Sequence, residues 1–147
     1  MCIRDRKSSA AELAGSIRDS AKLAQAYASA TTAKIAVVTG KAYGSAYVAL
    51  ASTAAGSDFT FAWEGAVIAP TTPEAAVVFL NGVSEDNAKQ AQEYADNEAD
   101  AFTAAANGYV DRVITAEDTK SALTSAIEAT SSKRVVTPAK KHVNFVY

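Results

Sequence analysis

Residues 34–47 read KIAVVTGKAYGSAY, and the fold class follows from this segment. Residues 35–38 are a short, wholly apolar run with β-branched side chains, which is typical of a strand buried on both faces. Gly40 ends the run, and Gly44 opens an alanine-rich stretch that predicts a helix up to about residue 55. A buried strand, a tight turn and a helix therefore follow one another directly.

Strands and helices alternate along the rest of the chain. Residues 11–30 predict a helix whose apolar positions recur at three- and four-residue steps. These positions are Leu13, Ile17, Ala21, Ala24, Tyr27 and Ala28. Further strands are expected at residues 59–63, 66–68 and 108–114, and further helices around residues 73–80, 88–100 and 119–127. This alternation predicts an α/β domain with parallel strand pairing.

Two helix starts are marked by their residues. Thr72 precedes Pro73, which gives a hydroxyl cap followed by proline in the first turn. Thr115 and Asp118 form a pair that resembles a capping box. The carboxylates before the last predicted strand are interpreted as a solvated helix face, and residues from 131 onward as a basic tail. These carboxylates are Glu93, Asp96, Glu98 and Asp100.

Composition limits the class of protein. The chain has 147 residues, 49% of them hydrophobic and 20% charged, which fits one globular domain. Its net charge of −2 gives no basic footprint for nucleic acid. The single cysteine, Cys2, excludes an internal disulfide and favours a reducing, cytoplasmic location. The longest uncharged stretch, residues 42–57, is too short and too polar to span a bilayer.

Residues 1–6 differ in style from the rest of the chain. They carry Arg4, Asp5 and Arg6 with no apolar segment behind them, so they are not a secretory signal. One interpretation is a foreign prefix on a truncated chain, with the domain occupying residues 7–147. The other is an ordinary frayed terminus.

The usual side-chain catalysts are missing from the sequence. His142 is the single histidine, and no Cys/His cluster has the spacing of metal ligands. No Walker loop or complete GxGxxG is present. What remains is the helix start near Gly44, where backbone amides without intrahelical partners could hold a developing oxyanion. The alternative is that Gly44 and Ala46 only allow close packing of the helix against the strand.

Six segments in order resemble the carboxyltransferase subunits of biotin-dependent acyl-CoA carboxylases and related decarboxylases. Residues 34–47 are similar to the family's strand-turn-helix segment, usually seen as K-AYGGAY. Residues 17–28 resemble the preceding helix, and residues 58–63 and 73–77 the strand and helix that follow. Residues 108–111 and the segment with Pro138, Lys140, Lys141, His142 and Asn144 resemble the closing GYVD and PKKHGN motifs.

The resemblance implies a crotonase-like fold, in which ββα units wind into a superhelix. The family subunit has two such halves, and this chain resembles the C-terminal half, truncated at its N-terminal side. The implied partners are a biotin carboxyl carrier protein, the N-terminal half that binds the CoA thioester, and further copies of the subunit. The implied reaction is carboxyl transfer between carboxybiotin and an acyl-CoA, without a metal.

Carried over by position, the backbone amides of Ser45 and Ala46 would form an oxyanion hole that faces biotin. Gly44 would allow the turn, and Ser45 replaces the second glycine of the family motif. Tyr47 would line the biotin pocket, unless it is a core aromatic. Val48 stands at a position that resembles the family's acyl-selectivity site.

Several interpretations stay open at this point. Trp63 is followed by Glu64 where the family usually has proline, and the tryptophan is interpreted as a packing residue. His142 with its two lysines could bind a CoA phosphate or be a solvated terminus. The alternatives to carboxyl transfer are a biotin-independent crotonase-fold enzyme, which needs a catalytic acid near the turn, and a non-catalytic assembly module.

Overall fold

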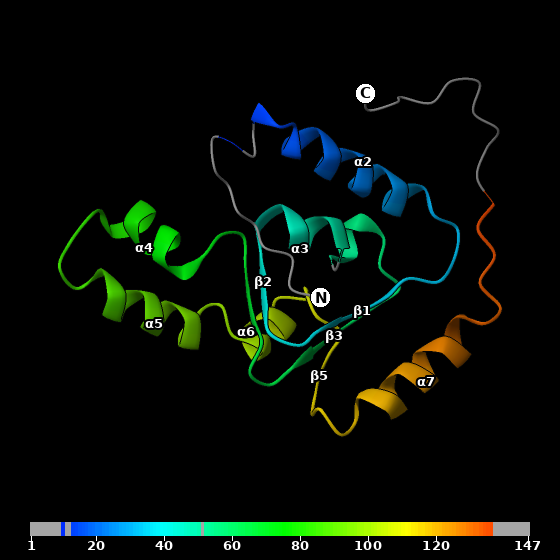
Figure 1. Ribbon diagram of the computed structural model, residues 1–147. Helices are drawn as coiled ribbons and strands as arrows, with labels where there is room; N and C mark the ends of the chain where they lie inside the picture. The colour runs from blue at the N-terminus through cyan, green and yellow to red at the C-terminus, as the bar shows by residue number, and fades with distance from the viewer. Residues whose placement is uncertain (1–9, 11–12, 51, 137–147) are drawn as a thin grey trace.

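The computed structural model describes residues 10, 13–50 and 52–136, except for the side chains of Ser45, Ala46 and Ala54. It contains two parallel sheets (Figure 1). The main sheet has the order β1 (Ile35–Val38), β3 (Phe59–Trp63) and β5 (Arg112–Ile114). The small sheet pairs β2 (Lys41–Tyr43) with β4 (Val67–Ala69).

The chain repeats one unit: a strand of the main sheet, a bend, a strand of the small sheet, and a helix. The first unit is β1, β2 and α3 (Gly44–Leu50), and the second is β3, β4 and α4 (Pro73–Asn81). β5 begins a third turn that continues into α7 (Thr119–Thr130). The ββα winding that the resemblance implies is confirmed.

The remaining helices surround these units (Figure 1). They are α2 (Ser16–Ser29), the 3₁₀ turn η1 (Thr53–Ala55), α5 (Asn87–Asn97) and α6 (Ala101–Ala106). α2 lies along α3, and α4 and α5 form a helical hairpin that extends away from the sheets.

The main sheet is covered on both faces, because its side chains alternate in direction. On one face, Val38 and Ala62 join a cluster with small residues of α6, here called the α6 cluster. Its buried members are Val38, Ala62, Ala66, Ile68, Ala101, Ala104 and Val110. On the other face, Phe61 and Ile114 pack against Ala122 and Ala126 of α7. Helices with alanine at the contact can approach a sheet closely, and the buried residues of both α6 and α7 are alanines.

Several local expectations need correction. β1 is only half-buried over most of its length, because it is an edge strand beside β3. The helix from Gly44 ends at Leu50 rather than near residue 55, and Ser52 caps the 3₁₀ turn that follows. β2 was not expected, since three residues are too few for a periodic signal.

The predicted apolar face of the first helix is not buried. α2 has no buried residue, and Leu13 and Ile17 are 90% and 68% exposed. The pattern identified the helix correctly. It did not identify what covers the face, because α2 contacts α3 and its half-buried residues are Ala21, Ala24 and Gln25.

α6 was also missed, and it changes the interpretation of Asp100. The Asp100 carboxylate accepts hydrogen bonds from the amides of Phe102 and Thr103 at 2.8 and 3.1 Å, so it caps α6. A side-chain hydrogen bond with Thr103, together with these weaker backbone contributions, lowers the pKa of Asp100. A six-residue helix is too short for a hydrophobic period to show, but its N-cap aspartate was a usable signal. Glu93, Asp96 and Glu98 are exposed, as predicted.

Two aspartates fix the register of the main sheet by the same arrangement. Asp58 directly precedes β3; its amide donates to the carbonyl of Lys34 at 2.8 Å, and its carboxylate accepts from the amide of Lys34 at 2.7 Å. Asp111 directly precedes β5 and makes the corresponding pair with Thr60, at 2.9 and 2.7 Å. Each aspartate thus ties the start of its strand to the neighbouring strand by two bonds.

The contacts of Lys133 differ from those expected of a solvated basic tail. Its ammonium lies 2.7 Å from Asp58 and donates to the carbonyl of Thr32 at 3.3 Å. The segment after α7 therefore returns to the start of β1 and β3, rather than running free in solvent.

We expect Asp58→Ala to lower the free energy of unfolding by about 1–3 kcal/mol, because it leaves the Lys34 amide and the Lys133 ammonium without their acceptor. Glu93→Ala is the matched control. Glu93 pairs with Lys89 at 3.8 Å on an exposed helix face, so a change of less than about 0.5 kcal/mol is expected. Denaturant unfolding followed by circular dichroism measures both. Equal effects would show that the Asp58 contacts contribute no more than a surface pair.

The same contacts predict how stability changes with pH. The hydrogen bond from Lys133, followed by that from the Lys34 amide, lowers the pKa of Asp58 below its ordinary value of 3.8. This stabilisation is complete above the ordinary value and is lost as pH falls through the lowered one. The difference in the free energy of unfolding between wild type and Asp58→Asn should therefore become smaller as the pH falls. A difference that stays constant from neutral into acid pH would contradict the assignment.

Candidate functional site at the bend between β2 and α3

The bend between β2 and α3 requires glycine. Gly44 follows Tyr43, the last residue of β2, and is also the first residue of α3. It is buried and has φ of +61°, in the left-handed region that L side chains rarely adopt. The change from strand to helix takes place at this one residue. The predicted role of Gly44 in allowing the turn agrees with this conformation.

Ser45 and Ala46 are the second and third residues of α3. The first amides of a helix have no acceptor within it, and they lie at the positive end of the helix dipole. Amides at these places can donate to an oxygen atom of a ligand. The arrangement is suited to a carbonyl oxygen on which negative charge develops.

Tyr47 and Val48 point in different directions. The Tyr47 ring is half-buried against the α6 cluster, and its hydroxyl lies 3.5 Å from the carbonyl oxygen of Tyr109. Burial, followed by the effect of Tyr109, raises the pKa of Tyr47 above its ordinary value. Val48 is 53% exposed. Tyr47 therefore has a packing role. Its expected part in lining the biotin pocket stays a prediction, as does the expected place of Val48 at an acyl-selectivity position.

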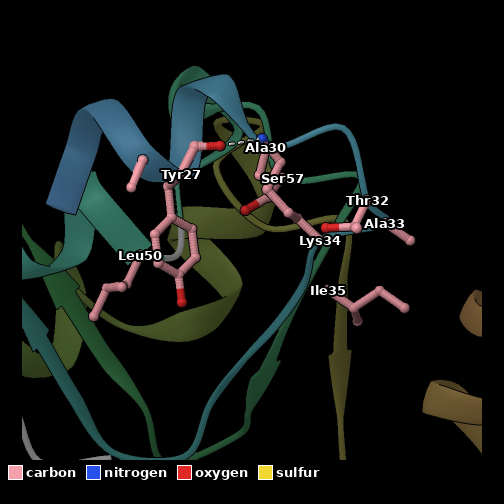
Figure 2. Close-up of a pocket in the computed structure, with 9 residues that line it drawn as sticks. Tyr27, Ala30, Thr32, Ala33, Lys34, Ile35, Leu50 and Ser57 are labelled. Atoms are coloured by element: carbon pink, nitrogen blue, oxygen red, sulfur yellow. Dashed lines mark hydrogen bonds between the residues drawn. The ribbon is translucent and has the colours of Figure 1, made fainter. Parts of the chain in front are cut away.

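A cavity of about 410 Å³ lies at the opposite end of α3 (Figure 2). It is lined mainly by small and apolar residues from the end of α2, the start of β1 and the end of α3. These are Ala26, Tyr27, Ala30, Thr32, Ala33, Lys34, Ile35, Leu50 and Ser57. It includes none of the residues predicted for the site, and no motif in the sequence indicated it.

Lys34 is the charged residue of this cavity, and its contacts are those of a helix cap. Its ammonium donates to the carbonyl of Tyr27 in the last turn of α2 at 2.7 Å (Figure 2). It also donates to the carbonyl of Ala55 at 3.5 Å. A side chain at Gly56, which has φ of +83°, would come within 3.1 Å of the ammonium. Glycine there leaves room for the lysine. The cavity therefore contains a structural cation.

The other candidate residues are placed as follows. The Trp63 indole donates to the hydroxyl of Thr119 at 2.9 Å and packs in the cluster under α7, which agrees with a packing role. His142, Lys140 and Lys141 lie outside the described residues. Over the described ranges, no three His, Cys, Asp or Glu residues are grouped to hold a metal ion, and no helix is long and apolar enough to cross a membrane.

Glu74 was not among the site residues predicted from the sequence. It is exposed in the first turn of α4, and its charge raises the pKa of Tyr43, although burial of that tyrosine has the larger effect. Tyr43 pairs with Ala69 in the small sheet, shortly before α4 begins. Glu74 is therefore a carboxylate near the bend. The spacing of 30 residues between Gly44 and Glu74 concealed this proximity.

Comparison with known proteins agrees with this geometry. Residues 6–145 match the family described as "Carboxyl transferase domain". The methylmalonyl-CoA carboxyltransferase 12S subunit of Propionibacterium freudenreichii subsp. shermanii is 39% identical over 142 residues, which cover 91% of this chain and 27% of that protein. The methylmalonyl-CoA decarboxylase subunit alpha of Veillonella parvula is 38% identical over 133 residues, covering 90% and 26%.

Solved structures give the same result. A transcarboxylase 12S crystal structure, with methylmalonyl-coenzyme A and methylmalonic acid bound, superposes with a TM-score of 0.87 at 39% identity. It covers 95% of this chain and 28% of that chain, so the chain spans about a quarter of the length of these relatives. The beta subunit of P. aeruginosa geranyl-CoA carboxylase, at 21% identity and a TM-score of 0.72, supports the fold alone. The chain belongs to the carboxyl transferase domain family and has its crotonase-like fold.

Proposed function

We propose that this chain is the biotin-facing half of a carboxyltransferase, which moves a carboxyl group between carboxybiotin on a carrier protein and an acyl-CoA. The observation that carries the proposal is the family match over residues 6–145, with a buried, left-handed glycine at the start of α3. The similar proteins include a carboxyltransferase, propionyl-CoA carboxylases and a decarboxylase. Transfer of the carboxyl group is the step that these names share.

The residues at the bend fit a ureido ligand. A ureido oxygen accepts hydrogen bonds, and the start of α3 offers donors beside a position without a side chain. When bound, carboxybiotin supplies both the carboxyl group and a base. The amides of Ser45 and Ala46 then donate to the ureido oxygen and stabilise the charge that gathers on it. No ionisable side chain of this chain is needed for that step.

The remaining parts of the site are proposed to come from partners. They are the biotin carboxyl carrier protein, the N-terminal half of the subunit, which binds the CoA thioester, and further copies of the whole subunit. The transcarboxylase 12S relative is described as a hexamer. Several large apolar side chains are open to contact, among them Leu13 at 90% and Phe79 at 88% exposure. The single cysteine favours a cytoplasmic setting.

A second candidate function is a biotin-independent crotonase-fold reaction on an acyl-CoA. The observation in its favour is Glu74, an exposed carboxylate in the first turn of α4, which begins shortly after Ala69 pairs with Tyr43, next to Gly44. A general acid or base beside an oxyanion-binding turn is what hydrolysis or hydration of a thioester needs. The two functions differ in whether biotin takes part.

A chimera tests the proposed function. This chain replaces the matching segment of the P. freudenreichii 12S subunit, so that the composite site is complete. We expect carboxyl transfer from a carboxylated carrier protein, and its loss when avidin sequesters the biotin. Glu74→Gln should leave this transfer within about twofold of the parent chimera. Activity on an acyl-CoA that resists avidin but needs Glu74 would favour the second candidate, and the isolated chain is expected to be inactive.

A glycine substitution tests the bend. We expect Gly44→Ala to reduce the rate of the chimera by about 10²-fold, because a Cβ at positive φ strains the backbone and moves the amides that follow. Gly65→Ala is the control, since a Cβ at that position meets no atom within 4 Å and the residue lies in a different bend, between β3 and β4. Initial rates of carboxyl transfer measure both variants. Equal rates would show that the left-handed residue does not matter for the reaction.

A further inference from the structure

Tyr47 is the large side chain that fixes the first turn of α3. The residues before it in the helix are Gly44, Ser45 and Ala46, among the smallest amino acids, and Val48 after it is 53% exposed. The Tyr47 ring packs against the α6 cluster, whose buried members are alanine, valine and isoleucine. The position of the first turn therefore depends on this side chain.

The Tyr109 carbonyl, which the Tyr47 hydroxyl approaches, is held in place on its N-terminal side. Tyr109 follows Gly108, which has φ of +78° and ends α6. The amide of Gly108 donates to the carbonyl of Ala105 at 3.0 Å, and that of Tyr109 to the carbonyl of Ala104 at 2.9 Å. This pair of bonds is a Schellman motif, which holds the Tyr109 peptide against the end of the helix.

The Tyr109 carbonyl is also held in place on its C-terminal side. Val110 is 3% exposed within the α6 cluster. Asp111 is tied to Thr60 by the two bonds that set the register of β5. The Tyr109 carbonyl is thus held between α6 and the main sheet, and it gives Tyr47 a stationary acceptor.

We infer that Tyr47 is a positioning residue, whose ring and hydroxyl hold the bend at Gly44 against the turn at Gly108 and Tyr109. Its effect on catalysis rests on the proposed function, because Tyr47 acts through the amides of Ser45 and Ala46. The distance of 3.5 Å from hydroxyl to carbonyl is long for a hydrogen bond, so the ring contributes more than the hydroxyl.

Hydrogen exchange of this chain tests the positioning directly. Tyr47→Phe keeps the ring and removes the donor, so exchange of the amides in residues 41–50 should become about twofold to tenfold faster, with little change in the melting temperature. Tyr47→Leu should speed exchange further. Tyr94→Phe, on α5, is the control and should leave this segment unchanged. Wild-type exchange in both Tyr47 variants would overturn the inference.

Kinetics of the chimera test the consequence for the reaction. Tyr47→Phe should lower kcat about twofold to tenfold and leave the KM for the acyl-CoA unchanged, since the residue acts on the turn and not on the CoA half. A wild-type kcat would overturn the catalytic role. An inactive wild-type chimera together with faster exchange in Tyr47→Phe would contradict the proposed function, while the positioning of the bend would stand.

Discussion

The paired hydrogen bonds between an aspartate and the backbone of the neighbouring strand support the whole arrangement. The strands of the main sheet have only three to five residues, so each pair has few ladder bonds to define its register. Asp58 adds a side-chain bond at the start of β3, and Asp111 does so at the start of β5. A slip of one residue would break these bonds and turn Phe61 and Ala62 to the wrong faces. Register is therefore specified twice, by polar pairing and by burial.

The register of the main sheet determines where the bend at Gly44 lies. β1 and β3 run in parallel, and each continues through a bend into the small sheet, where Tyr43 pairs with Ala69. The start of α3 is thereby fixed relative to β4 and to α4, which begins at Pro73. Asp111 also helps to fix the start of α3, because the Tyr109 carbonyl that Tyr47 approaches lies two residues before Asp111. A site made of backbone groups needs this support, since the placement of an amide is that of the chain itself.

Local chemistry predicted much of the fold, and the misses share a cause. The β-branched run at β1, the strand at β3 and the cap and proline of α4 carry signals within a few residues. β2 and α6 have three and six residues, which is too short for a hydrophobic period, and of the two only α6 carries a local mark, its N-cap aspartate. Burial was harder to predict than the helices and strands themselves. The leucine and isoleucine of the first predicted helix are exposed, whereas alanines make the contacts of α6 and α7. An apolar pattern gives the direction of a face, but not what covers it.

The candidate site shows the same division. Gly44 could be identified from sequence because a positive φ restricts the residue type, and the family motif pointed to the same position. The proximity of Glu74 and the acceptor of Tyr47 could not, because both depend on contacts between segments far apart in the chain. Ionisable catalysts leave a mark in composition, whereas amides occur at every residue but proline. A site built from amides is therefore recognised by the residues that shape the backbone around it, and here these are a glycine, two aspartates and a tyrosine.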